Sequence, residues 1–238
     1  KINITKLAYG KIGIPKRWSF GEKLQQIENN YGNFKEKIIS KITGFLIDVD
    51  GKKVLTDTGL HLDVIRKPSI ALGSYLYTEF PVFADESNFV VNQIKQKGIS
   101  LSDIDYVFLS HLHFDHAGGL EEFEKSKIIL GQEELEELKK DRSSDLVNID
   151  GNQAFSKIFR DKITENKRVI NVNCKYFDLF NDERVIILRS DGHTKGHFSL
   201  ILFSYKNPSD FIFSSEIFHI LSNRTEKTME NQQRFTRF

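Results

Sequence analysis

Short runs of apolar positions, separated by polar turns, divide the chain into candidate strands and helices. Residues 43–57 (TGFLIDVDGKKVLTD) are two apolar runs joined by Asp50-Gly51, a dipeptide that readily takes the positive φ angles of a tight hairpin turn. Residues 88–97 carry apolar side chains at helical spacing and stop at Gly98, which is typical of a helix end. The pattern predicts an antiparallel hairpin followed by a helix.

Further apolar runs, each short enough for a single strand, predict the rest of the sheet structure. These strands are expected at 105–110, 127–130, 185–190, 198–205 and 210–215. The stretch 132–140 (QEELEELKK) predicts a helix whose charges form a solvated face, and 152–165 predicts a polar helix. Strands at both ends with helices interspersed indicate an α/β or α+β fold, with loops at strand ends available for chemistry.

The segment 67–87 is aromatic and irregular, and it has two interpretations. It is either a loop that packs its own side chains or a lid that forms one wall of a substrate site. No internal repeat or obvious linker divides the chain, so residues 1–238 are predicted to be a single domain.

Composition excludes several classes of protein. Lys and Arg number 34 against 33 Asp and Glu, so the formal charge of +1 gives no reason to expect nucleic acid as the main partner. No run approaches the roughly 20 apolar residues of a membrane span, and the first residues do not resemble a signal peptide. The single cysteine, Cys174, cannot form an internal disulfide, which favours a reducing compartment and a cytoplasmic location.

Three of the seven histidines fall within six residues, in the run His-Leu-His-Phe-Asp-His directly after a predicted strand. Alternation along an extended chain would point His111, His113 and Asp115 to one side, and His116 can join them where the backbone bends. Imidazole nitrogens and a carboxylate oxygen suit zinc or another first-row divalent metal. The alternative is a set of hydrogen-bonded surface histidines, but nothing structural requires four such donors in six positions.

A second histidine motif, Asp-Gly-His-Thr-Lys-Gly-His at 191–197, also follows an apolar strand. His193 would supply the third nitrogen ligand of a tetrahedral site. His197 opens the next strand, so we predict a structural, hydrogen-bonded histidine there rather than a ligand.

These motifs together resemble the metallo-β-lactamase superfamily. The resemblance rests on the HxHxDH run from His111 to His116, the GHTxGH run around His193 and the VLTDTG run at 54–59, and it covers about Thr43 to His219. It implies a four-layer αββα sandwich with two metal ions, expected to be zinc, with iron or manganese as alternatives, in a cleft at one edge of the sheets.

The resemblance also implies roles for individual residues. His111, His113 and His193 would hold the first metal, and Asp115 and His116 the second. Asp57 would support the site by accepting a hydrogen bond from the histidine-bearing loop. The alternative for this residue is ordinary turn chemistry in Asp-Thr-Gly.

The sequence departs from the family pattern in two places. Glu216 stands where the family usually has a metal-bridging aspartate, so it is either the bridging ligand or a solvent-facing carboxylate. The family's last histidine ligand has no clear counterpart. His219 could take its place, or donate a hydrogen bond to the substrate carbonyl as a catalytic residue, or merely line the pocket. We favour the last alternative, with the final ligand and the closing strand beyond Phe238.

The chain is most similar to the N-acyl homoserine lactone lactonase branch. This implies a metal-dependent hydrolase that acts on a lactone or another carboxylic ester through a metal-bound hydroxide, which the catalytic Asp115 would orient. Aromatic side chains around the cleft would suit an acyl chain. The alternatives are a glyoxalase-II-like thioesterase, a β-lactamase, or a catalytically impaired metal-binding or structural member of the fold. A nuclease is disfavoured by the near-neutral charge.

Overall fold

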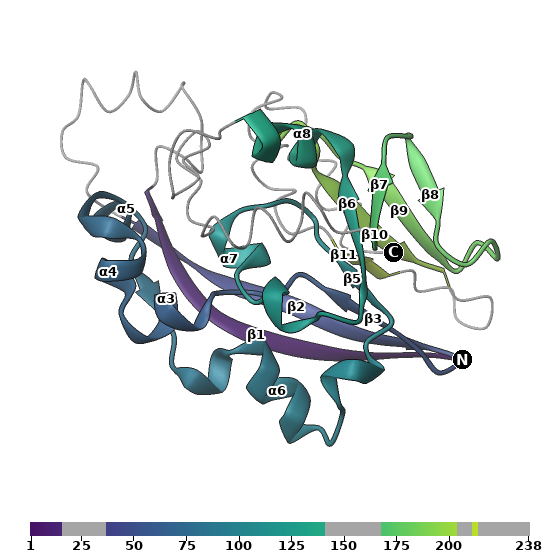
Figure 1. The fold of residues 1–238 in the computed structure, drawn as a ribbon, viewed down its shortest axis with the longest axis horizontal. Helices are drawn as coiled ribbons and strands as arrows, with labels where there is room; N and C mark the ends of the chain where they lie inside the picture. Colours follow the sequence, from purple (N-terminus) through teal and green to yellow (C-terminus); the bar gives the residue numbers. More distant parts are fainter. Residues whose placement is uncertain (16–36, 141–167, 204–210, 214–238) are drawn as a thin grey trace.

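Two β-sheets form the framework of the protein (Figure 1). The computed structural model describes residues 1–15, 37–140, 168–203 and 211–213. Within them the larger sheet has the strand order β4-β1-β2-β3-β5-β6-β7 and the smaller sheet β11-β10-β9-β8. The predicted α/β architecture is therefore confirmed.

The described elements are two long strands, β1 and β2, and a series of shorter strands and helices. The larger sheet contains β1 (Ile2–Pro15), β2 (Lys37–Val49), β3 (Lys52–Thr56), β4 (Val82–Phe83), β5 (Tyr106–Phe108), β6 (Lys127–Gly131) and β7 (Val169–Val172). The smaller sheet contains β8 (Tyr176–Asp178), β9 (Val185–Arg189), β10 (Phe198–Leu202) and β11 (Phe211–Phe213). The helices are α3 (Leu62–Arg66), α4 (Pro68–Ala71), α5 (Gly73–Glu79), α6 (Val90–Gln96), α7 (Phe114–Ala117) and α8 (Gln132–Lys140). Single 3₁₀ turns lie at η1 (Glu86–Asn88), η2 (Leu101–Asp103) and η3 (Leu120–Glu122).

The predicted hairpin and the predicted helix after it are both present. Strands β2 and β3 pair antiparallel, and their turn holds Asp50 at a φ of 51° and Gly51 at 90°, the positive angles that a tight turn requires. Helix α6 ends before Gly98, whose φ is 72°. The strands predicted at 105–110, 127–130, 185–190, 198–205 and 210–215 correspond to β5, β6, β9, β10 and β11. Strand β1, which pairs with β2 along its length, was not predicted.

The larger sheet is buried on both faces, because helices cover one face and the smaller sheet packs on the other. On β5, Val107 points into the core shared with α3, α5 and α6, while Phe108 points into the core shared with β9 and β10. Successive side chains on a strand face opposite ways, so a strand covered on both sides needs an uninterrupted apolar run. Burial on both faces explains the uninterrupted apolar run from which β5 is predicted.

Three parallel neighbours, β3, β5 and β6, end at the same edge of the larger sheet. Asp57 directly follows β3, the histidine-bearing loop follows β5, and α8 begins directly after β6. The carboxyl ends of adjacent parallel strands are where α/β proteins place their functional groups. This edge therefore brings together residues that are far apart in the sequence.

The segment 67–87 is more regular than predicted. It contains α4, α5 and β4. Pro68 supplies the fixed φ that suits the first turn of α4, and Gly73, at a φ of 73°, turns the chain into α5. Ile70 and Tyr75 are 76% and 72% exposed, so these two side chains do not pack within the segment. Its function as a lid stays a prediction.

Some predictions fall outside the described residues. They include the polar helix at 152–165, Glu216, His219 and the helix expected near the end of the chain. Among the described helices, none combines the length and apolar character needed to cross a membrane.

Candidate metal centre

Asp57 anchors the histidine-bearing loop to the end of β3. Its carboxylate accepts hydrogen bonds from the Ser110 amide at 2.8 Å and the Ser110 hydroxyl at 3.0 Å, and its Oδ2 lies 2.8 Å from His116 Nδ1. These are contacts of the kind predicted for Asp57 as a support of this loop. Its further role, fixing metal ligands in place, stays a prediction.

The backbone of Asp57 is itself held in an uncommon conformation. Its φ is 50°, a left-handed value that aspartate tolerates better than most residues. The Tyr9 hydroxyl donates to the Asp57 carbonyl at 3.0 Å, and the Asp57 amide donates to the Phe108 carbonyl at 2.8 Å. Tyr9 packs so closely on Gly59 that a Cβ there would lie 2.5 Å from its ring. Asp57 is therefore fixed from both sides.

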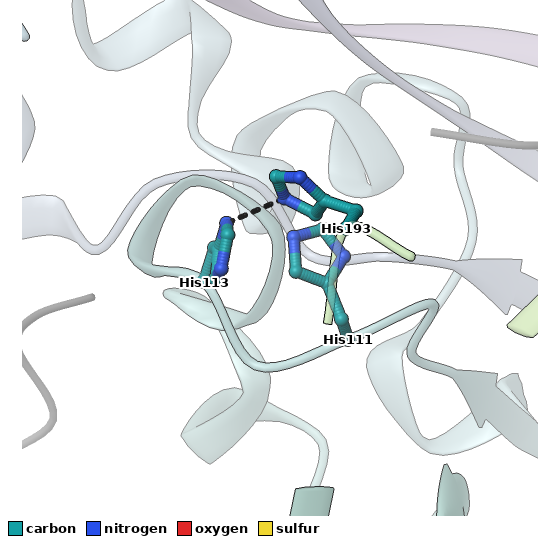
Figure 2. A group of neighbouring side chains, drawn as sticks. All are labelled: His111, His113 and His193. Atoms are coloured by element: carbon teal, nitrogen blue, oxygen red, sulfur yellow. Dashed lines mark hydrogen bonds between the residues drawn. The ribbon is translucent and has the colours of Figure 1, made fainter. Parts of the chain in front are cut away.

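Three histidines from the loops after β5 and β9 converge: His111, His113 and His193 (Figure 2). Each offers one nitrogen, and the three nitrogens lie within 4.8 Å of one another. His193 Nε2 is 2.9 Å from His113 Nδ1. The Ser110 hydroxyl is 2.9 Å from His111 Nδ1, while Nε2 of His111 is buried and has no hydrogen-bond partner among the described residues.

The surroundings of His111 favour a neutral ring. The side chain is fully buried, and its ring centroid lies between 4.1 and 5.2 Å from those of four other histidines. Burial first, and then the neighbouring histidines, hold the pKa of His111 well below its ordinary value. A neutral imidazole is the form that binds metal. The three converging nitrogens fit zinc or another first-row divalent ion.

Asp115 and His116 form a second pair beside this group. His116 Nε2 lies 3.3 Å from Asp115 Oδ2. Burial favours the neutral ring of His116, but Asp115 and Asp57 outweigh burial and raise its pKa well above the ordinary value. Burial also opposes ionisation of Asp115, yet His116 keeps the pKa of that carboxyl lowered. The two residues are adjacent as expected, and their binding of a second metal stays a prediction.

His197 has the structural setting that the sequence predicts. It is fully buried, and its Nδ1 lies 2.8 Å from the Ser190 hydroxyl. Burial and then His116 lower the pKa of His197 to about 3. It lies outside the group of three converging nitrogens.

Glu134 corrects the interpretation of α8 as a helix with a wholly solvated charged face. The residue is only 7% exposed. Its Oε2 accepts a hydrogen bond from the Leu112 amide at 3.0 Å, and its Oε1 accepts one from the Gly196 amide at 3.2 Å. Burial raises the pKa of the Glu134 carboxyl, against hydrogen bonds from the Thr194 side chain and from the two main-chain amides, which lower it. Helical spacing was the available signal, because Glu134 shares a face with the buried Leu138 four residues later.

A second contact with α8 holds the His193 loop. Arg189 donates to Glu133 at 2.6 Å, to Asp191 at 2.7 Å and to the Lys195 carbonyl at 3.1 Å. The guanidinium thus joins the helix to both ends of the loop.

Comparison with known proteins identifies the family of this chain. The family model described as "Metallo-beta-lactamase superfamily" matches residues 42–206. An N-acyl homoserine lactonase of a Bacillus species is 25% identical over 82% of this chain and 68% of its own length. Related lactonases of Bacillus cereus and Bacillus thuringiensis match over 58% and 56% of their lengths.

Solved structures show the same fold. A variant of the Bacillus thuringiensis lactonase AiiA, solved with N-decanoyl-L-homoserine at its active site, is 16% identical, with 97% of this chain and 89% of that chain covered and a TM-score of 0.67. AidC, described as a dizinc quorum-quenching lactonase, is 20% identical over 89% of this chain and 70% of that chain, with a TM-score of 0.55. With the family model matching well over half of its length, the chain belongs to the metallo-beta-lactamase superfamily.

Proposed function

We propose that the protein is a metal-dependent hydrolase of carboxylic esters, with N-acyl homoserine lactones as its substrate class. The observation that carries the proposal is the convergence of the His111, His113 and His193 nitrogens within 4.8 Å. The choice of lactones is supported by relatives named as N-acyl homoserine lactonases.

The chain offers ligands for two metal ions. His111, His113 and His193 would hold one, and Asp115 and His116 would contribute to the other. When bound, zinc supplies a hydroxide nucleophile near neutral pH and draws electron density from the substrate carbonyl. AidC, which has the same fold and is described as a dizinc lactonase, supports the proposal of two metal ions.

The side chains of the protein prepare and complete this chemistry. Burial keeps His111 neutral and ready to ligate. Asp115, kept ionised by His116, can orient the attacking oxygen, accept a proton and pass it to the leaving oxygen. Asp57 holds Ser110 and His116, and so fixes the loop on which all of these groups lie.

The test is hydrolysis by purified protein loaded with zinc. N-acyl homoserine lactones of several chain lengths, S-lactoylglutathione and a β-lactam serve as substrates. Hydrolysis of each is monitored through the acid that it releases. We expect lactone hydrolysis that is lost on chelation and restored by zinc. Thioester hydrolysis without lactone hydrolysis at any chain length would replace the proposal with a glyoxalase-II-like activity. Stable, metal-free protein without any hydrolysis would indicate an impaired member.

Histidine variants connect the activity with the site. Replacing both His111 and His113 by Ala should abolish zinc binding at the first site and the hydrolysis with it. His61→Gln is the matched control. The His61 Nε2 atom lies 2.8 Å from Glu121 Oε1, and His61 is not one of the three converging histidines. Unchanged zinc stoichiometry in the double variant would refute the ligand assignment.

A further inference from the structure

Two buried carboxylates, Asp57 and Glu134, flank the loop that carries His111. They follow β3 and β6, the two strands on either side of β5 in the sheet. Asp57 accepts from the amide of Ser110, and Glu134 accepts from the amide of Leu112. The residues immediately before and after His111 are thus each bonded to a carboxylate from a neighbouring strand end.

Glu134 differs from Asp57 because it also reaches the other sheet. Its second oxygen accepts from the amide of Gly196, three residues after His193. One carboxylate thereby spans the loop with His111 and His113 and the loop with His193. Both bonds are made to main-chain amides, so they position the backbone from which the histidine side chains extend.

The packing around this carboxylate leaves little room for movement. A Cβ on Gly196 would lie 2.6 Å from the Glu134 amide nitrogen and 2.8 Å from its Cγ. A Cβ on Gly131 would lie 2.2 Å from the Gly196 carbonyl oxygen. Main chain therefore contacts main chain where α8 begins. Because the carboxylate is buried, loss of either hydrogen bond is not compensated by bulk water.

We propose that Glu134 is a positioning residue that sets the spacing between the His111 and His113 nitrogens and the His193 nitrogen, and thereby the affinity of the site for metal. The inference rests on the proposed metal-dependent function, since it assigns the metal to these three histidines. A supporting group of this kind typically contributes about 10- to 100-fold to metal affinity. In this role Glu134 acts through the main chain and is not one of the three proposed ligands.

Glu134→Gln tests the proposal with almost no change of shape. Glutamine can accept from one of the two amides, but its amide group would then face the other amide, donor against donor. Glu136→Gln is the matched control on the same helix, because Glu136 is exposed and bonds to the Gln132 side chain at 2.7 Å. Three quantities are measured for both variants and wild type. They are zinc affinity by chelator competition, the visible spectrum of the cobalt(II)-loaded protein, and amide hydrogen exchange of the metal-free protein at 110–114 and 194–198.

We expect Glu134→Gln to bind zinc about 10- to 100-fold more weakly, to alter the cobalt(II) spectrum and to exchange faster in both segments, while Glu136→Gln matches wild type. Faster exchange with unchanged zinc affinity and cobalt spectrum would make Glu134 a merely structural residue and overturn the proposal. Unchanged hydrogen exchange would refute the idea that the two hydrogen bonds of Glu134 hold these segments in place. Wild type that binds zinc at these histidines but hydrolyses no ester would refute the proposed function alone, and wild type without zinc affinity would refute both.

Discussion

The two histidine-bearing loops are held in different ways. The loop after β5 is anchored by short, buried groups: Ser110 and His111 are fully buried, and Asp57 reaches the loop directly from the neighbouring strand. The loop after β9 is more open, with Gly192 exposed and His193 only partly buried. It is fastened by the longer side chains of Arg189 and of Glu134, and Glu134 also accepts a hydrogen bond from Leu112 in the first loop. His111 is thus held within the sheet core, whereas His193 depends on side chains that can be changed without removing a strand.

This difference separates two properties. Damage to the first loop should lower the free energy of unfolding, because its anchors are part of the sheet core. Damage to the attachment of the second loop should lower metal affinity more than stability.

Asp57→Ala should have the largest effect. It removes a buried carboxylate from Ser110 and His116 and leaves their donors without an acceptor, which typically costs about 3–5 kcal/mol. Urea unfolding of the metal-free protein measures this loss. Asp63→Asn is the control, because the Asp63 side chain is 74% exposed and should change stability by less than about 0.5 kcal/mol. A similar small change for Asp57→Ala would contradict the first half of the comparison.

Replacing one glycine near each loop by alanine should separate stability from zinc affinity. A Cβ at Gly118 would lie 2.2 Å from the His61 nitrogen and 2.6 Å from the Leu60 carbonyl carbon, which are main-chain atoms. A Cβ at Gly196 would meet Glu134, including its flexible side chain. We expect each variant to lose about 1–3 kcal/mol by overpacking, with the larger loss at Gly118.

The discriminating measurement for these two variants is zinc affinity relative to stability. Gly196→Ala should weaken zinc binding more than Gly118→Ala does, because Glu134 must move to admit the new methyl group. Equal zinc affinity in wild type and Gly196→Ala would show that the second loop does not depend on its contact with α8.

Tyr9→Phe should have the smallest effect. It deletes the hydrogen bond to the Asp57 carbonyl while keeping the ring that packs on Gly59, so we expect a loss of about 0.5–1.5 kcal/mol. Thermal or urea unfolding measures it, with the 72% exposed Tyr75 replaced by Phe as a neutral control. A Tyr9→Phe protein as stable as wild type would mean that the left-handed backbone of Asp57 needs no outside support.

Much of the fold could be predicted because local patterns coincide with it. The Asp50-Gly51 turn, the end of α6 at Gly98 and the apolar run of β5 each have a local cause. Strand β1 has a pattern of alternating apolar and polar residues, which indicates a strand as well as it argues against a signal peptide. For Glu134, the helical spacing with Leu138 indicates burial, but no local pattern identifies the amides that the carboxylate meets after folding. Glu216 and His219 stay predictions.

The wide separation of the two histidine-bearing loops along the sequence has a consequence for synthesis of the chain on the ribosome. His193 follows its partner His113 by 80 positions, and Gly196 follows Glu134 by 62. A growing chain can complete the hairpin of β2 and β3 early, whereas pairing across such separations must wait for later segments and is slow. A partly synthesised chain would hold only two of the three converging imidazoles. Tight zinc capture is therefore expected late, after β9 and the loop that follows it have emerged.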